Sequence, residues 1–206
     1  MTSIESTGQF RRAPGRARRP ESGTASGALV PDRIGEVYLS AEELRLRVEE
    51  LGAEIAEDYE GREPILVAQL KTSVIFVADL CRALPIIQEL DFIALAGYAG
   101  GDAGPSSVRL LKDLDLSIQG RDVLLVEDVV DTGLTLNYVC KTLALRSPAS
   151  LTAVTLLDRP YRRLVESLPV KYVGFTVPDE FFVGYGFDLG DDRYRHLPDL
   201  RIANAR

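Results

Sequence analysis

The chain has 206 residues, of which 46% are hydrophobic and 27% charged, and its formal net charge is −7. This length and composition suit one soluble globular domain, and no apolar run reaches the roughly 18 residues that a membrane-spanning helix needs. The first 30 residues hold five arginines and two glutamates of the 24 basic and 31 acidic residues, so residues 31–206 carry a net charge of −10. This acidity disfavours nucleic-acid binding by the folded part and predicts no membrane association.

Residues 1–30 are rich in Gly, Ser, Pro and Arg and lack hydrophobic periodicity, which predicts a disordered basic leader. An arginine-rich tail could contact nucleic acid, and a transit peptide has a similar composition. An extension without a specific function, or a misassigned start codon, also explains the segment. The two cysteines, Cys81 and Cys140, lack metal-ligand spacing, and there is no apolar segment for secretion. We therefore expect a cytoplasmic protein with reduced thiols.

The first regular element follows the leader. Ser40 and Glu43 form a capping box ahead of apolar residues at helical spacing, which predicts a helix that ends near Gly61. Residues 64–70 are then predicted to form a buried strand, and residues 73–84 a helix that Pro85 closes.

The same alternation continues to the end of the chain. The pattern predicts, in order, a strand at 91–96, a Gly-rich loop at 97–107, a short strand at 108–111, a helix at 136–145, and strands at 151–157 and 172–177. Strands that alternate with helices are typical of a doubly wound, mostly parallel α/β sheet with flanking helices. We expect residues 31–206 to form one such domain.

The most informative segment is the apolar strand 123–126 with the turn that follows it. Glu127 and Asp128 come directly after the apolar residues, and Asp131 precedes the hydroxyl-rich turn 132–135. Ligands of open α/β sheets bind at the carboxyl ends of strands, and free amides at the start of a helix suit a phosphate. Carboxylates can accept hydrogen bonds from sugar hydroxyls or hold hard cations. The segment therefore predicts a sugar-phosphate site.

Residues 126–135 resemble the phosphoribosyl pyrophosphate signature of the type I phosphoribosyltransferases. Further segments resemble the hypoxanthine-guanine branch in the same order, and they lie at 70–73, 97–98, 108–113, 156–160 and 173–185. The resemblance runs from about Ile34 to Leu197. It implies the type I phosphoribosyltransferase fold, with a small hood formed by the terminal segments.

The resemblance also implies an activity in purine salvage. In this family, N9 of a 6-oxopurine displaces pyrophosphate from C1 of phosphoribosyl pyrophosphate under Mg²⁺, and hypoxanthine or guanine gives IMP or GMP. An acid near the base is needed because the purine must lose its N7 proton as N9 attacks. Family members usually assemble as homo-dimers or homo-tetramers, so the same is expected here.

Individual residues match the family's functional positions. Asp131 matches the general base, and Asp188 matches a metal ligand near pyrophosphate. Glu127 and Asp128 match the residues that bind the ribose hydroxyls and contribute negative charge to the metal site. The remaining matches are Thr132, Gly133, Leu134 and Thr135 for the 5-phosphate, Lys71, Thr72, Tyr98 and Arg195 for pyrophosphate, and Arg159, Phe181, Phe182 and Val183 for the purine.

Three positions depart from the family's pattern, and one assignment stays open. Arg159 stands where relatives usually carry a lysine, and its planar fork differs from an ammonium ion. Thr72 replaces a glycine, which matters if that position needs a positive φ. Gly97 replaces a serine at the start of the mobile loop. This chain has one residue more than common relatives after Asp188, so Arg193 is an alternative to Arg195.

Two other functions are compatible with these departures. One is the same fold retuned to xanthine or another base through Arg159. The other is a non-catalytic regulator that senses phosphoribosyl pyrophosphate and contacts nucleic acid through the leader. The sole histidine, His196, is interpreted as a surface residue.

Overall fold

The computed structural model describes residues 34–96 and 109–204. The chain separates into two units, Met1–Val30 and Pro31–Arg206, and every described residue belongs to the second. The leader and the loop expected at 97–107 lie outside the described residues, so both stay predictions. Among the described helices, none is long and apolar enough to cross a membrane.

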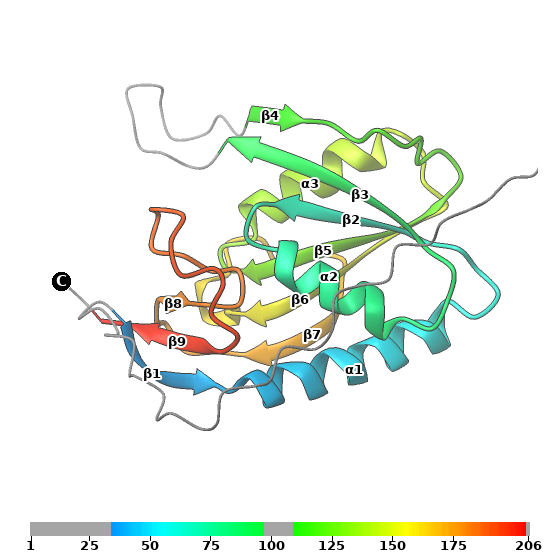
Figure 1. Ribbon diagram of the computed structural model, residues 1–206. Coiled ribbons are helices and arrows are strands. Elements are labelled where there is room, and N and C mark those ends of the chain that lie inside the picture. Colours follow the sequence, from blue (N-terminus) through cyan, green and yellow to red (C-terminus); the bar gives the residue numbers. More distant parts are fainter. Residues whose placement is uncertain (1–33, 97–108, 205–206) are drawn as a thin grey trace, which may run out of the picture. The chain divides into compact units, whose positions relative to one another are not determined.

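A six-stranded sheet forms the body of the second unit (Figure 1). Its strands, in order across the sheet, are β4 (Arg109–Lys112), β3 (Glu89–Ala96), β2 (Ile65–Leu70), β5 (Asp122–Val130), β6 (Ser150–Asp158) and β7 (Val170–Thr176). All neighbours pair in parallel except β4, which runs antiparallel to β3. The expectation of a doubly wound, mostly parallel sheet is confirmed.

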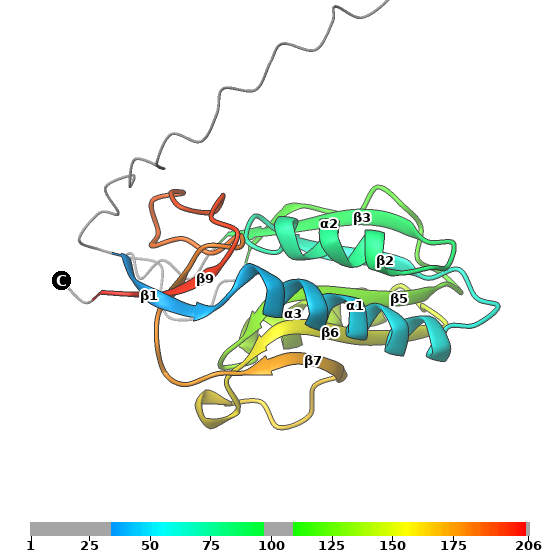
Figure 2. The same cartoon turned by 60° about the horizontal axis from the view of Figure 1, so that its bottom comes forward.

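Helices cover both faces of this sheet (Figure 2). Helices α1 (Ala41–Asp58) and α2 (Val74–Ala83) pack on one face, and α3 (Leu134–Ala144) packs on the other; a short 3-10 helix, η1 (Pro160–Arg162), follows β6. The two buried clusters separate by strand parity, because alternate side chains point to opposite faces. The α1 and α2 face receives Leu124 and Val126 of β5, and the α3 face receives Val123 and Leu125.

The predicted start of α1 is confirmed in detail. The Glu43 amide donates to Ser40 Oγ at 3.3 Å, and the Ser40 amide donates to Glu43 Oε2 at 2.8 Å. These reciprocal bonds satisfy two backbone donors that a helix start leaves free. The helix ends at Asp58, three residues before the expected Gly61, with Tyr59 as its C-cap.

A second, three-stranded antiparallel sheet corresponds to the expected hood. Its order is β1 (Ile34–Leu39), β9 (Leu200–Ala203) and β8 (Phe182–Val183), so it joins the two ends of the described chain. The strands β2, β5 and β6 point toward the side on which β8 and β9 lie (Figure 1). Phe182 and Leu200 of the hood pack into the same buried cluster as α1 and α2. The hood is therefore anchored beside the carboxyl ends of the sheet.

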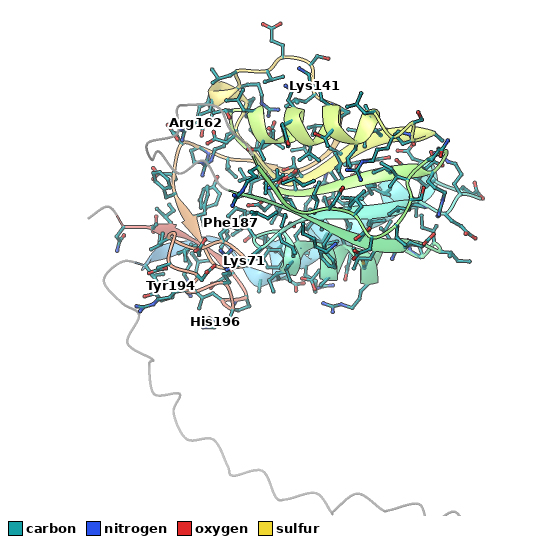
Figure 3. The ribbon with its side chains drawn as sticks, turned by 90° about the horizontal axis from the view of Figure 1, so that it is seen from above. Lys71, Lys141, Arg162, Phe187, Tyr194 and His196 are labelled. Atoms are coloured by element: carbon teal, nitrogen blue, oxygen red, sulfur yellow. The ribbon has the colours of Figure 1, made fainter. Side chains whose placement is uncertain are left out.

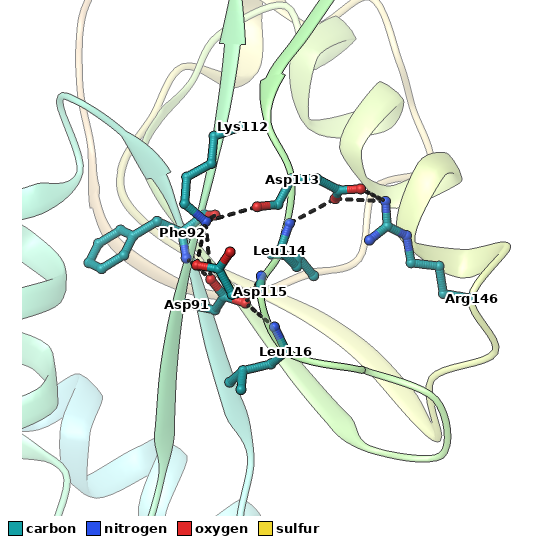
Figure 4. Close-up of polar contacts among 8 residues, drawn as sticks. All are labelled: Asp91, Phe92, Lys112, Asp113, Leu114, Asp115, Leu116 and Arg146. Carbon is teal, nitrogen blue, oxygen red and sulfur yellow. Dashed lines mark hydrogen bonds and ion pairs between the residues drawn. The ribbon is translucent and has the colours of Figure 1, made fainter.

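The connection after β4 is fixed by a buried carboxylate (Figure 4). Asp91 of β3 is 4% exposed and accepts hydrogen bonds from the amides of Asp115 and Leu116, both at 2.8 Å. Lys112 adds an ion pair to Asp91 at 3.5 Å. Backbone hydrogen bonds and Lys112 hold the pKa of Asp91 below its usual value although burial opposes them. Asp91 thus holds the segment that leads back to β5.

Candidate active site

The site lies where the order of the main sheet reverses. From β2 the chain proceeds outward to β3 and β4, whereas from β5 it proceeds to β6 and β7 on the other side. Such a switch point leaves a crevice at the carboxyl ends of the two central strands. A cavity of about 300 Å³ lies there, and it is lined by Gln69, Thr72, Glu127, Asp128, Val129, Val130, Asp131, Thr132, Gly133, Thr135 and Leu136.

Two adjacent acids of β5 enter this cavity from opposite faces of the sheet. The strand continues to Val130, two residues beyond the acids, whereas its pairing with β2 ends at Ala68 opposite Val126. Glu127 is 5% exposed, and burial together with Asp128 raises its pKa well above the usual value. Burial also raises the pKa of Asp128 to about 6, with Asp188 raising it and Arg195 lowering it. Two carboxylates at adjacent positions, one buried and one half-buried, favour a cation or hydroxyl donors.

The turn before α3 has the form expected of a phosphate-binding turn. Gly133 is the N-cap of α3 with φ +81°, and the Asn137 amide donates to its carbonyl at 2.9 Å. Within the described residues, the one acceptor for an amide of residues 132–135 is Thr132 Oγ1, at 3.4 Å from the Leu134 nitrogen. The other amides of this turn are therefore available to an anion. Leu134 is 39% exposed and does not line the cavity, whereas Leu136, which was not predicted, does.

Gly133 is expected to be essential for the geometry of this turn. A Cβ there would lie 2.7 Å from Leu168 Cδ1 and 3.2 Å from Arg163 Cδ, in addition to the left-handed backbone. We expect Gly133→Ala to lower the free energy of unfolding by about 2–3 kcal/mol in denaturant titrations. Gly120→Ala is the matched control, because Gly120 also has a positive φ of +68° but no atom within 4 Å of the added Cβ. An equal loss in both variants would contradict the steric account.

Asp131 lies at the opposite side of the turn from the helix start, between two arginines. Arg162 Nε is 3.1 Å from Asp131 Oδ1, and Arg159 Nη1 is 3.9 Å from Asp131 Oδ2. Asp131 Oδ1 is nevertheless buried without a hydrogen-bond donor among the described residues. This carboxylate oxygen can therefore accept a proton from a ligand.

Arg159 connects Asp131 with the segment predicted to bind the purine. It is 8% exposed, donates to the carbonyl of Glu180, and lies over the ring of Phe182 at 5.6 Å. Its Nε is buried and has no acceptor within the described chain. Phe181 is 72% exposed, whereas Phe182 and Val183 are buried in β8. The ring of Phe181 is therefore the one free to contact a flat ligand.

A third group of predicted residues lies around the loop after β2. Arg195 donates from Nη1 to Thr72 Oγ1 at 3.2 Å, and its Nη2 lies 2.9 Å from Asp188 Oδ1. The alternative candidate, Arg193, donates a hydrogen bond from its backbone amide to Asp191 Oδ1 at 3.3 Å. Of the two arginines, Arg195 is therefore the one whose side chain lies beside Asp188. Thr72 is not among the described residues with positive φ, so the anticipated strain does not arise. The peptide bond between Leu70 and Lys71 is cis. Tyr98 lies outside the described residues.

Three further residues of the site were not predicted. Gln69 lines the cavity with its Oε1 buried and without a donor among the described residues, Arg162 pairs with Asp131, and Asp192 accepts from Lys71 Nζ at 2.8 Å. Gln69 could have been predicted as a site residue, because it is a polar residue near the end of the otherwise apolar run 64–70. Arg162 and Asp192 gave none, because their partners are distant in sequence.

Unsatisfied buried polar atoms concentrate at this edge of the sheet. Asp131 Oδ1, Gln69 Oε1, Arg159 Nε and Arg195 Nε are four of the six such side-chain atoms in the described part of the chain. Because buried polar groups normally have partners, this concentration indicates a place for a polar ligand. The fold and the site define a doubly wound α/β protein with a polar cavity at its switch point that is suited to an anionic ligand.

Comparison with known proteins agrees with this class. The family described as Phosphoribosyl transferase domain matches residues 36–189. The hypoxanthine phosphoribosyltransferase of Salmonella typhimurium is 48% identical over 165 residues, which cover 79% of this chain and 92% of that protein. The hypoxanthine-guanine phosphoribosyltransferase of Mycobacterium avium is 46% identical over 184 residues, covering 86% and 90%. The chain belongs to the phosphoribosyltransferase family.

A solved structure supports the same assignment. The crystal structure of a hypoxanthine-guanine phosphoribosyltransferase from Bacillus anthracis superimposes with a TM-score of 0.78 at 39% identity, covering 84% of this chain and 99% of that one. The match includes sequence and fold together, so the enzyme class predicted from the sequence is confirmed.

Proposed function

We propose that this protein transfers the 5-phosphoribosyl group of phosphoribosyl pyrophosphate to N9 of hypoxanthine or guanine, giving IMP or GMP and pyrophosphate. The observation that carries this proposal is the set of unsatisfied polar atoms around the switch-point cavity, which match a sugar phosphate on one side and a purine on the other. The names of the relatives support the same bases.

The donor is assigned to the β5 side of the cavity. The amides and hydroxyls of residues 132–135 suit the 5-phosphate, and the carboxylates of Glu127, which is buried, and Asp128, which is half-buried, suit the ribose hydroxyls. Lys71, Thr72 and Arg195 are assigned to pyrophosphate, because a lysine and an arginine lie beside one loop there. Tyr98 is retained as a predicted pyrophosphate contact.

The base is assigned to the side of Asp131 that faces β8. As the N9–C1 bond forms, the C1–O bond to pyrophosphate breaks, and the proton leaves N7 for Asp131 Oδ1. Arg159 Nε is a buried donor without an acceptor, which suits the purine O6. The exposed ring of Phe181 is assigned to stacking, and the backbone of Phe182 and Val183 to the O6 edge.

Mg²⁺ is proposed as the cofactor, and the residues at the site fit it. No group of three or more described His, Cys, Asp or Glu side chains is arranged to hold a metal alone, and Mg²⁺ normally uses one or two carboxylates with ligand phosphates. Asp188 would hold it, with Glu127 and Asp128 nearby, whose pKa values are raised by burial first and by a neighbouring carboxylate second. When bound, the ion supplies neutralisation of the charge that develops on the departing pyrophosphate.

The choice of base tests the role of Arg159. In competition among hypoxanthine, guanine, xanthine and adenine, we expect the first two to be consumed. Arg159→Gln should lower kcat/KM for the preferred base by about 10- to 100-fold, because it removes a charged hydrogen bond to O6. Arg159→Lys should retain most of the activity because the charge remains. A preference for xanthine in the unchanged enzyme would assign the fold to another base.

We also propose that the protein works in the cytoplasm as a homo-dimer or homo-tetramer. The assembly is supported by apolar side chains that are exposed in the single chain, among them Ile87 at 71% and Leu90 at 42%. Light scattering of the full chain at micromolar concentration should give two or four times 22.6 kDa.

A further inference from the structure

A single carboxylate joins the two cationic side chains assigned to pyrophosphate. Asp192 Oδ2 accepts from Lys71 Nζ at 2.8 Å, and Asp192 Oδ1 accepts from Arg195 Nη2 at 2.9 Å. Lys71 belongs to the loop after β2 and Arg195 to the segment after Asp188, so the bridge connects two separate parts of the site. Figure 3 shows Lys71 next to the segment that carries Tyr194 and His196.

The backbone presents Asp192 for this contact. Asp192 has φ +58°, in the left-handed region, and its amide donates to Asp188 Oδ2 at 2.7 Å. The hydrogen bonds from Lys71 and Arg195 hold the pKa of Asp192 below its usual value, so the side chain is ionised at neutral pH. Each oxygen of this carboxylate thus pairs with one cation, as an oxygen of a phosphate group would, and on Arg195 it shares Nη2 with Asp188.

The bridge is exposed enough to be displaced. The side chains of Asp192 and Lys71 are 58% and 67% exposed. An exposed ion pair such as Lys71–Asp192 contributes at most about fivefold to an equilibrium constant, whereas the Arg195 side chain is 23% exposed. A pyrophosphate carries more charge than one carboxylate, so it can replace Asp192 on both cations.

We propose that Asp192 competes with the pyrophosphate group for Lys71 and Arg195 and thereby sets the affinity of the enzyme for its donor and for released pyrophosphate. The proposal rests on the function proposed above. Asp192 occupies both cations before the donor arrives, is displaced when the donor binds, and returns as pyrophosphate leaves. Removing its charge should therefore strengthen pyrophosphate binding.

The test is titration calorimetry of inorganic pyrophosphate with Mg²⁺ into the full chain. We expect Asp192→Asn to bind pyrophosphate about three- to tenfold more tightly than the unchanged protein, with a matching decrease in KM for the donor. Asp192→Glu should restore weaker binding. The control Asp191→Asn removes one charge a residue earlier, leaves both Asp192 contacts in place, and should change affinity less than twofold.

Unchanged or weaker pyrophosphate binding by Asp192→Asn would overturn the proposal, and so would an equal gain in Asp191→Asn. These results are distinct from a failure of the proposed function. If the unchanged protein converts neither hypoxanthine nor guanine, the function fails. If it converts either base and the variants bind pyrophosphate equally, only the role of Asp192 fails.

Discussion

Asp131→Asn is expected to lower kcat by about 10²- to 10⁴-fold, the range for loss of a general base, while donor binding changes little. The reason is that Asp131 Oδ1 is the buried carboxylate oxygen without a hydrogen-bond donor among the described residues. An asparagine keeps the shape of the side chain but cannot take the N7 proton. Single-turnover kinetics of IMP formation, with calorimetry of donor binding, measure the two effects separately.

Asp179→Asn is the matched control for this experiment. Asp179 and Asp131 each lie 3.1 Å from a nitrogen of Arg162, but the side chain of Asp179 is 62% exposed. Its substitution should change kcat less than threefold, because exposed ion pairs contribute little. An equal loss of kcat in both variants would assign the effect to Arg162. Loss of donor binding in Asp131→Asn would make Asp131 a structural residue of the turn.

Asp128→Asn is expected to weaken donor binding by about 10- to 100-fold and, at pH 8, to stabilise the fold by about 1–2 kcal/mol. Burial raises the pKa of Asp128 to about 6, so the ionised side chain is unfavourable in the folded protein. The bound donor and its cation are expected to interact favourably with that charge. In the empty site the same charge destabilises the fold. Thermal unfolding should therefore shift upward by about 3–6 °C at pH 8.

The pH dependence of the gain follows from the direction of the pKa shift. Because the pKa of Asp128 in the folded protein lies above its ordinary value of 3.8, the folded protein binds more protons than the unfolded chain between pH 3.8 and about 6. The destabilisation that ionised Asp128 causes is therefore absent below this pH window and reaches its full size above it. The gain from Asp128→Asn should thus disappear near pH 4. Asp188→Asn is the control: its carboxylate has an arginine partner at 2.9 Å, so its removal should give no stabilisation.

Most of the fold followed from local patterns in the sequence. The capping box at Ser40 and the apolar run 64–70 predicted α1 and β2, because each signal lies within one element. The strands of the hood were not assigned individually. β8 has two residues and β9 four, and their pairing joins segments about 20 residues apart, so neither carries a periodic signal of its own.

The part of the site that was predicted consists mainly of functional residues that lie close together in the sequence. Glu127, Asp128, Asp131 and the turn 132–135 lie within one nine-residue stretch of the sequence, and seven predicted residues, Thr72 among them, line one cavity. The arginine contacts were not predictable, since Arg162 reaches Asp131 across 31 positions and Asp192 reaches Lys71 across 121. Such pairs depend on how the hood and the loops fold over the sheet.

The central claim is that the switch-point cavity performs phosphoribosyl transfer to a 6-oxopurine. The most direct measurement incubates the full chain with phosphoribosyl pyrophosphate, Mg²⁺ and hypoxanthine or guanine, and quantifies the nucleotide and pyrophosphate formed. We predict IMP or GMP and pyrophosphate in equal amounts, with neither product when the donor is omitted. Folded protein that forms no nucleotide from either base would contradict the account.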